Sequence, residues 1–456
     1  MKEDSAELSR RSLLKLSAAT GIGTFVAPLA SRAYAALFED KHLTPIAWNG
    51  TDGSVRFRID GTAKVVGDKV FAYDIRARDM PHWPQQQAHA LLLCASFADR
   101  VFAGIDLSGL GEELKPDRVV TAEDLVRDGI AFPAFYGDDM LLPAGKTPAY
   151  LGHAVALLVY KDFARFRHAK NKLRTLAGTV RAGAATGPLE REPWAAFRYV
   201  RVGGDTPYAD DKFSTLKDTI VFPSFKKRQA NWPEALMGGK LDQQGMAHAN
   251  AIPSELDKAD DSTLVIDREY FSQSTDTAAL EPDNANCWWG RVKQELYMVV
   301  PTQSPLEVVE SMAKMLAGAR FKVGKLFVHP CYTVGYGSKD HYNFPFYGAM
   351  AAFYGDGLPV RLANDRFEQF QTSIKRHSIR MQYRMAGDRK SGLIKSFKGE
   401  FLLDGGGRMN FTPSVTLVAA TSAQSVYYLP KSDFYAVGLA SRAVDAGSAR
   451  GYGTLQ

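Results

Sequence analysis

Hydrophobic residues in the first third of the chain recur in short runs that predict a small mixed domain. The run at residues 152–160 is almost continuously apolar, which is typical of a strand buried on both faces. Helical spacing between such runs predicts helices, and Thr121 with Asp124 fits a cap at the start of one of them. The expected strands are 63–66, 69–73, 89–94 and 150–160, and the expected helices are 121–127 and 163–175. This alternation predicts a compact α+β domain over residues 61–176.

A second patterned region follows a stretch of weaker pattern. Residues 177–260 hold clusters of Gly, Asp, Lys and Pro, and we interpret them as a connecting region. Beyond them, Val308, Met312, Met315 and Leu316 recur at helical spacing. The expected strands are 267–272, 294–300, 325–329 and 399–404, the expected helices are 305–316 and 345–354, and 405–407 is a glycine turn. The pattern thus predicts a second α+β domain over residues 261–456.

The first 35 residues predict an export signal. A charged stretch ends near Arg10 and Arg11, an uncharged run covers residues 16–30, and residues 33–35 read Ala-Tyr-Ala, like a cleavage site. Paired arginines mark the twin-arginine type, so we expect a periplasmic protein with residues 36–60 as a polar lead-in. The apolar run of about 15 residues is interrupted by Gly and Pro and is too short for a membrane span. An amphipathic helix with a chance Arg-Arg pair is the alternative.

Composition narrows the class of protein. The chain has 456 residues, of which 45% are hydrophobic and 23% charged, as in globular rather than disordered proteins. Its net charge of +6 falls to +4 without the predicted leader, because residues 1–35 carry five basic and three acidic side chains. This excess is too small to indicate nucleic-acid binding. Cys94, Cys287 and Cys331 form no C-x-x-C pair, so neither a four-cysteine zinc site nor a cysteine-ligated iron–sulfur cluster can be built from them.

Four segments of the second half are unusual for a hydrophobic core, namely residues 270–282, 301–305, 332–340 and 446–456. The last two of these contain Gly-Tyr-Gly. Glycines beside an aromatic residue let backbone N–H groups approach a ligand, and N–H groups at a helix start favour anions. Each segment taken singly is more typical of a turn. The histidines of this half have no metal-ligand spacing, so a metal site held by His side chains is not predicted.

Together and in this order, the four segments resemble the molybdopterin-binding subunit of the xanthine dehydrogenase/aldehyde oxidase family, the molybdenum hydroxylases. Leu-Glu-Pro at 280–282 resembles the family's Glu-Pro segment, and Thr-Gln-Ser-Pro at 302–305 resembles the segment whose glutamine lies beside the molybdenum oxo ligand. Residues 335–340 resemble the glycine-rich cofactor loop, although with fewer glycines, and 450–453 resemble the R-G-[FY]-G loop. The first domain resembles the family's α/β hammerhead domain. The resemblance therefore implies that residues 261–456 are the first half of the molybdopterin-binding region, also α+β in class.

The resemblance also implies a cofactor and the residues that bind it. The cofactor is a molybdenum–pterin, either molybdopterin or its cytosine dinucleotide form, whose dithiolene supplies the sulfur ligands. Gln303 has the implied catalytic role, because its amide would stabilise charge that develops on the oxo group. Asp340 is the implied substrate contact. The implied cofactor contacts are Gln303, Gly335, Tyr336, Gly337, Ala449, Arg450 and Gly451.

The reaction implied by the family is oxidation of an aldehyde or an aromatic N-heterocycle with water as the oxygen source. Electrons would pass to an iron–sulfur subunit or a cytochrome. The family's G-x-G-E segment, which carries the catalytic glutamate, has no counterpart after residue 453, so we expect a second polypeptide to supply that half and the base. The main alternative is a catalytically inert, truncated remnant or assembly module of the family. A periplasmic ligand-binding protein is a weaker alternative.

Overall fold

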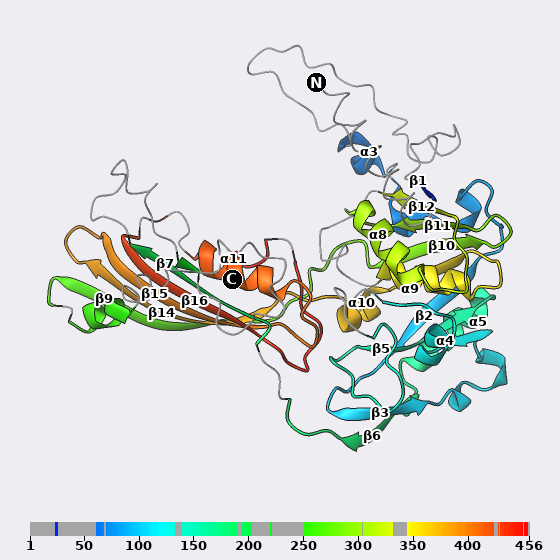
Figure 1. The fold of residues 1–456 in the computed structure, drawn as a ribbon, viewed down its shortest axis with the longest axis horizontal. Coiled ribbons are helices and arrows are strands. Elements are labelled where there is room, and N and C mark those ends of the chain that lie inside the picture. Colours follow the sequence, from blue (N-terminus) through cyan, green and yellow to red (C-terminus); the bar gives the residue numbers. More distant parts are fainter. Residues whose placement is uncertain are drawn as a thin grey trace, which may run out of the picture.

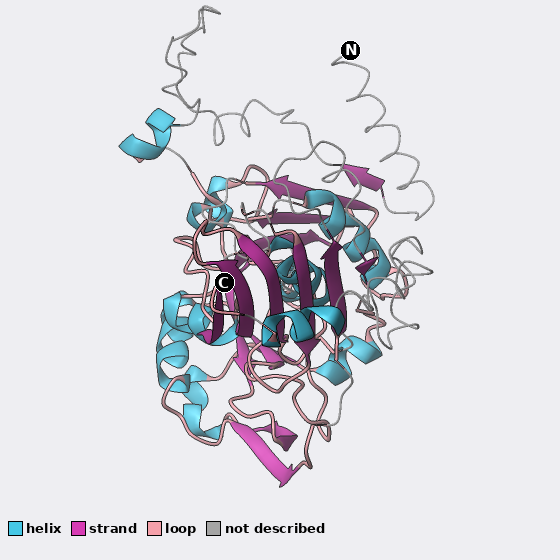
Figure 2. Cartoon of the chain, turned by 90° about the vertical axis from the view of Figure 1, so that its left-hand side faces the viewer, coloured by secondary structure: helices cyan, strands magenta, loops and turns pink. Residues whose placement is uncertain are grey.

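The chain is described by a computed structural model. The structure describes residues 23–25, 61–67, 70–132, 139–189, 193–202, 219–220, 250–258, 260–302, 304–331, 344–423, 427, 429–449 and 451–454. In this part of the chain, a large sheet with its helices lies beside a second sheet that extends away from it, and the whole is elongated (Figure 1). Seen from the end that carries the second sheet, the molecule has strands at its centre and helices around them (Figure 2).

The secondary structure is mixed throughout, as the sequence predicts. The strands are β1 Gly23–Phe25, β2 Ala88–Cys94, β3 Arg100–Ile105, β4 Arg118–Val120, β5 Ala154–Tyr160, β6 Val180–Ala185, β7 Ala195–Val202, β8 Thr219–Ile220, β9 Thr263–Ser272, β10 Asn284–Gly290, β11 Glu295–Val300, β12 Lys325–Pro330, β13 Val360–Ala363, β14 Ser378–Asp388, β15 Ile394–Asp404 and β16 Lys431–Leu439. The helices are α3 Gly61–Val66, α4 Ala122–Arg127, α5 Phe163–Leu173, α8 Pro305–Leu316, α9 Phe344–Phe353, α10 Arg366–Thr372 and α11 Thr412–Ser422, with 3-10 turns η1 Ala72–Asp74, η2 Ala77–Asp79, η3 Ser108–Leu110 and η4 Glu112–Leu114.

The larger sheet has eight strands in the order β1-β12-β11-β10-β13-β2-β5-β4. β5 is buried at all seven positions, which confirms the strand predicted from the continuous apolar run. α8 begins at Pro305, where a missing N–H costs no helical hydrogen bond, and it buries the apolar stripe that the periodicity predicts. α9 is buried along its whole length, and Gly348 lets it lie against β10, because a Cβ there would be 2.4 Å from the Cβ of Ala285. These helices and strands share one hydrophobic core.

The second sheet has six strands in the order β8-β7-β16-β15-β14-β9. One face packs against α11, where Val415 and Ala419 join Phe401 and Phe434 in a core of their own. Along β9, an edge strand, most side chains are exposed. The face turned away from α11 carries charged side chains in cross-strand pairs. A short third sheet joins β3 to β6.

The prediction of two short strands near the start of the first domain is wrong. Residues 63–66 lie in the helix α3. Of residues 69–73, the structure describes 70–73, and Ala72 and Tyr73 lie in the 3-10 turn η1, which η2 follows. A β-branched run forms a strand only where a neighbouring strand pairs with it, and Val65 is 87% exposed instead. The turns are specified by local polar contacts, since Asp74 accepts from the N–H of Phe71 at 3.1 Å.

The two sheets do not follow the expected domain boundaries. β2, β4 and β5 come from residues 61–176, yet they complete the same sheet as β10 to β13. The expected connecting region contains β7, which lies inside the six-stranded sheet, while β1 lies within the predicted leader and pairs with β12. The division at residue 261 therefore cuts across both sheets. Among the described residues, no helix is long and apolar enough to cross a membrane.

Candidate cofactor site

Most of the predicted cofactor residues fall outside the described part of the chain. Of the predicted site, the structure describes Ala449 and Gly451, together with the residues that flank the others. Ala449 is 1% exposed, and Gly451 has a φ of 67°, a conformation that favours glycine. The predicted residues outside the described ranges are Gln303, Gly335, Tyr336, Gly337, Asp340 and Arg450.

The loop that leads to Gly451 is anchored where the two sheets meet. The N–H of Lys375 donates to the carbonyl of Asp445 at 2.9 Å, and the N–H of Gly447 donates back to the carbonyl of Lys375 at 3.0 Å. Lys375 also forms a bridge with Asp276 on its other side. Three segments that are far apart in the sequence thus run side by side. We call residues 445–454 the cofactor loop.

Glycine allows the cofactor loop to pack tightly. A Cβ at Gly447 would lie 2.7 Å from the side chain of Ile374, and one at Gly453 would lie 2.7 Å from the carbonyl oxygen of Val415. Gly453, like Gly451, has a positive φ. Ala446 and Ser448 are nearly fully buried. The glycines of the cofactor loop therefore let its backbone pack closely against neighbouring segments of the protein.

A buried ion pair neutralises the carboxylate of the cofactor loop. Arg408 Nε donates to Asp445 Oδ2 at 2.9 Å, and a second guanidinium nitrogen contacts the same oxygen. The two side chains are 8% and 1% exposed. Burial by itself lowers the pKa of Arg408, but the adjacent Asp445 carboxylate outweighs burial and raises it. Because Arg408 stays charged, Asp445 presents no net negative charge that would repel an anionic ligand.

A second buried ion pair lies on the neighbouring segments. Lys375 Nζ donates to Asp276 Oδ2 at 2.7 Å, and the hydroxyl of Ser373 donates to the same oxygen at 2.7 Å. The ammonium group also donates to the backbone carbonyls of Gln369 and Ser373, both at 3.0 Å. Burial opposes ionisation of Asp276, yet the hydrogen bonds from Lys375 and Ser373 lower its pKa. All three donors of Lys375 are thereby satisfied in a buried position.

Residues on both sides of the predicted contact Gln303 are described, at the start of α8. Thr302 is 4% exposed, and its Oγ1 accepts from the N–H of Ser304 at 3.0 Å. The carbonyl of Ser304 then accepts the first helical hydrogen bond, from Val308 at 3.2 Å. The described residues Thr302 and Ser304 thus precede the N-terminus of a 12-residue helix, which carries partial positive charge.

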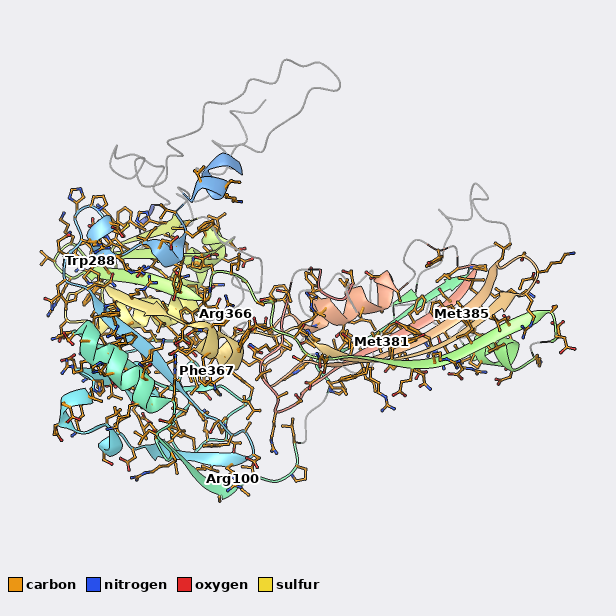
Figure 3. All side chains as sticks on the ribbon, turned by 180° about the vertical axis from the view of Figure 1, so that it is seen from behind. Arg100, Trp288, Arg366, Phe367, Met381 and Met385 are labelled. Atoms are coloured by element: carbon orange, nitrogen blue, oxygen red, sulfur yellow. The ribbon has the colours of Figure 1, made fainter. Side chains whose placement is uncertain are left out.

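The Glu-Pro segment joins residues near the start of the described chain to the start of β10 through hydrogen bonds of Glu281. Glu281 is 4% exposed, and its Oε1 accepts from the N–H of Tyr73 at 2.9 Å and from Asn284 Nδ2 at 3.2 Å. Nearby, Arg366 donates to the carbonyl of Ala279 at 2.6 Å. Figure 3 shows Arg366 in α10 on the side of the large sheet that is nearer to the six-stranded sheet, whereas Trp288 lies on the far side. Trp288 stacks on Tyr297 at 5.3 Å between ring centres.

The histidines of the second half that the structure describes lie in the protein interior. Burial lowers the pKa of His329 to about 4 and that of His377 to about 3, so both are neutral at pH 7. His377 shares a hydrogen bond of 3.0 Å with the hydroxyl of Thr412. Within the described ranges, no cluster of three or more His, Cys, Asp or Glu side chains is arranged to hold a metal ion.

A cavity of about 450 Å³ lies between α4 and residues 139–146. Its walls include Leu125, Ile130, Phe132 and Met140, with charged Arg127 and other polar side chains also lining it. Neither Ala449 nor Gly451, the two predicted cofactor contacts that the structure describes, lines it.

Comparison with known proteins identifies the second half of the chain. Residues 246–456 match the family model of the molybdopterin cofactor-binding domain. This segment is a molybdopterin cofactor-binding domain. The resemblance to the molybdenum hydroxylases that the sequence analysis predicted is thereby confirmed, as is the α+β class of the fold, while the signal peptide stays a prediction.

Solved structures share the fold of the domain and of the strands that precede it. CO dehydrogenase from Oligotropha carboxidovorans is 17% identical with a TM-score of 0.58, over 87% of this chain and 45% of its own. Aldehyde oxidoreductase from Desulfovibrio desulfuricans is 19% identical with a TM-score of 0.59, over 88% and 40%. Quinoline 2-oxidoreductase from Pseudomonas putida is 17% identical with a TM-score of 0.57, over 88% and 46%. The chain thus spans less than half the length of these proteins. A search of curated proteins gave no match.

The described part of the molybdopterin cofactor-binding domain is compatible with an anionic cofactor. The cofactor loop offers buried backbone at Ala449 and glycines at 447, 451 and 453, and its carboxylate is neutralised by Arg408. These features allow close approach of a ligand with a phosphate. The sequence analysis did not single out Arg408, Asp445 or Lys375. No local pattern marks them, since the partners of the two pairs are 37 and 99 residues apart.

Proposed function

We propose that the chain binds a molybdenum–pterin cofactor and forms part of a molybdenum hydroxylase. The observation that carries this proposal is the match of residues 246–456 to the molybdopterin cofactor-binding domain. The closely packed, charge-neutral cofactor loop supports it from the structure. When bound, the cofactor supplies two-electron oxidation of an electrophilic carbon with water as the source of oxygen.

The residues of this chain have separate roles in the proposal. The cofactor would be molybdopterin or its cytosine dinucleotide form. It would be bound through the backbone of Gly335, Tyr336 and Gly337 and through that of residues 449–451. Gln303 would donate from the start of α8 to an oxygen on which charge develops. Asp340 would contact the substrate. No residue described here is assigned the role of catalytic base.

For the substrate, the proposal draws on the names of proteins with a similar fold. The similar structures include an aldehyde oxidoreductase and a quinoline 2-oxidoreductase. We therefore propose an aldehyde or an aromatic N-heterocycle as substrate. Electrons would leave through an iron–sulfur subunit or a cytochrome, because Cys94, Cys287 and Cys331 are separate free cysteines.

Cofactor content tests the proposal directly. The chain would be produced in a bacterium that makes molybdenum cofactor, then assayed for molybdenum by metal analysis and for pterin by fluorescence after oxidative release. We expect near-equal amounts of metal, pterin and protein. A folded protein that contains neither would contradict cofactor binding and favour the inert remnant.

Periplasmic export is a separate proposal that rests on the predicted twin-arginine leader. Replacing Arg10 and Arg11 together by Lys should leave the precursor in the cytoplasm, as judged by cell fractionation. Normal export of this variant would refute the twin-arginine assignment.

A further inference from the structure

One buried ion pair lies directly on the cofactor loop. Arg408 follows the glycine turn after β15, and Asp445 opens the loop four residues before Ala449. Arg408 contacts Asp445 Oδ2 through two nitrogens, and its guanidinium lies 5.4 Å from the centre of the Tyr150 ring. Residues from both sheets therefore surround the pair, since Tyr150 precedes β5 of the larger sheet.

The surroundings of this pair leave little room for movement. At Gly407, a Cβ would lie 1.9 Å from the carbonyl oxygen of Ala149, and at Gly406 it would lie 2.5 Å from the carbonyl oxygen of Val444. The N–H of Leu151 donates to the carbonyl of Arg442 at 3.2 Å. Three segments thus close around Arg408: the one before β5, the glycine turn and the start of the cofactor loop.

Asp445 is held by both its side chain and its backbone. Its carbonyl accepts from the N–H of Lys375, and two residues later Gly447 donates to the carbonyl of Lys375. Burying a charged pair costs desolvation energy that its attraction often only offsets, so such a pair is weak evidence of a gain in stability. Its location points instead to control of the path of the loop.

We propose that Arg408 is a positioning residue for cofactor binding. It acts through Asp445, whose carboxylate it holds and neutralises, and so fixes the route of the cofactor loop to Ala449 and Gly451. Without Arg408, the loop loses its side-chain anchor and a buried carboxylate lacks its cation close to an anionic ligand. This inference rests on the proposed function.

The chain offers a matched control pair away from the cofactor loop. Arg198 in β7 contacts Asp433 in β16 through Nε and a terminal nitrogen, both at 2.7 Å. Their side chains are 19% and 0% exposed. This pair lies on the face of the six-stranded sheet opposite α11, so Arg198→Met removes the same kind of interaction without touching the loop.

The experiment compares cofactor content per folded chain in wild type, Arg408→Met, Arg408→Lys and Arg198→Met. Each protein is made in a host that produces molybdenum cofactor, and its melting temperature is measured on the same preparation. We expect Arg408→Met and Arg198→Met to lower the melting temperature, but only Arg408→Met to lose molybdenum and pterin, by about 10–100-fold, the loss typical when the support of a binding group is removed. Arg408→Lys keeps the charge and should recover part of the content.

Each other outcome overturns the inference. Wild-type cofactor content in folded Arg408→Met would show that the pair does not position the loop. An equal loss in Arg198→Met would show that loss of stability alone releases the cofactor. If Arg408→Met does not fold, full cofactor content in Arg408→Lys together with a lowered melting temperature would assign the pair to stability only. Wild-type protein without molybdenum or pterin would refute the proposed function, and this inference with it.

Discussion

The two large sheets of this protein bury their side chains in opposite ways. β5, inside the eight-stranded sheet, is buried at every position, and α9 is buried along its whole length. β9, at the edge of the six-stranded sheet, is exposed at most positions, and charged pairs such as Glu269 with Arg380 lie on the face turned away from α11. The eight-stranded sheet thus has a buried interior, whereas the face of the six-stranded sheet turned away from α11 is exposed towards its β9 edge, although Asp433 on the same face is fully buried.

The predicted site residues follow strands of both sheets along the chain. The cofactor loop follows β16 of the six-stranded sheet, while Gln303 follows β11 of the eight-stranded sheet. The buried pairs Arg408–Asp445 and Lys375–Asp276 lie on segments between them. Substitutions between the two sheets, inside the eight-stranded sheet and on the exposed face of the six-stranded sheet should therefore differ in how much stability they cost and in whether they affect activity.

The largest loss of stability is expected from breaking the buried Lys375–Asp276 pair, which lies between the two sheets. Lys375→Met leaves Asp276 as a buried carboxylate without its cation, which typically costs about 3–5 kcal/mol of unfolding free energy. Denaturant unfolding followed by circular dichroism measures this loss.

The same pair makes stability depend on pH. The pKa of Asp276 is lowered in the folded protein, so its contribution to the unfolding free energy is present above about pH 4 and is lost as the pH falls through its folded pKa. Asp276→Asn should therefore make the unfolding free energy depend less on pH below about pH 4. An unchanged pH dependence in this range would contradict the assignment.

A slightly smaller loss of unfolding free energy is expected when a cavity is created in the eight-stranded sheet. Leu157 is fully buried at the centre of β5, so Leu157→Ala should cost about 2–5 kcal/mol. Leu402, on the open face of β15, is 43% exposed, and Leu402→Ala should cost less than about 0.5 kcal/mol. Equal losses in the two variants would mean that both faces of the six-stranded sheet are covered in the protein.

Gln303→Ala separates catalysis from stability. In the assembled enzyme, loss of one preorganised donor typically lowers kcat by about 10²–10³-fold. Molybdenum content and melting temperature should stay close to wild type, because the helix that follows already begins with Pro305. A lowered melting temperature with unchanged kcat would instead assign Gln303 to the helix start, at about 1 kcal/mol.

The smallest effect is expected on the open face. Arg380 and Glu269 form a two-nitrogen contact at 3.0 and 2.8 Å, but both side chains are at least half exposed. Solvent screening makes such exposed pairs weak. Arg380→Ala should therefore lower the unfolding free energy only slightly at low salt and hardly at all at about 1 M salt. A large loss that persists at high salt would show that this face is not open.

Much of the local structure could be predicted from the sequence. The helix at 305–316 and the buried strand that ends at Tyr160 depend on neighbours within a few turns of the chain, and the structure confirms them. The family resemblance depends on the order of four short segments along the chain, and the family model confirms it. Hydrophobic spacing specifies such elements because it is a property of consecutive residues. By contrast, the expected strands at 63–66 and 69–73 are wrong, because a strand needs a partner that local sequence does not reveal.

By itself, the sequence determined the α+β class, the order of most helices and strands, and the segments that resemble a molybdopterin site. Only the tertiary structure decided that β2, β4 and β5 share a sheet with β10 to β13. It also decided that Arg408 meets Asp445 and that Lys375 meets Asp276. The reason is physical: strand pairing and buried ion pairs join residues that are distant along the chain, and the partner is fixed by packing and desolvation rather than by any local pattern.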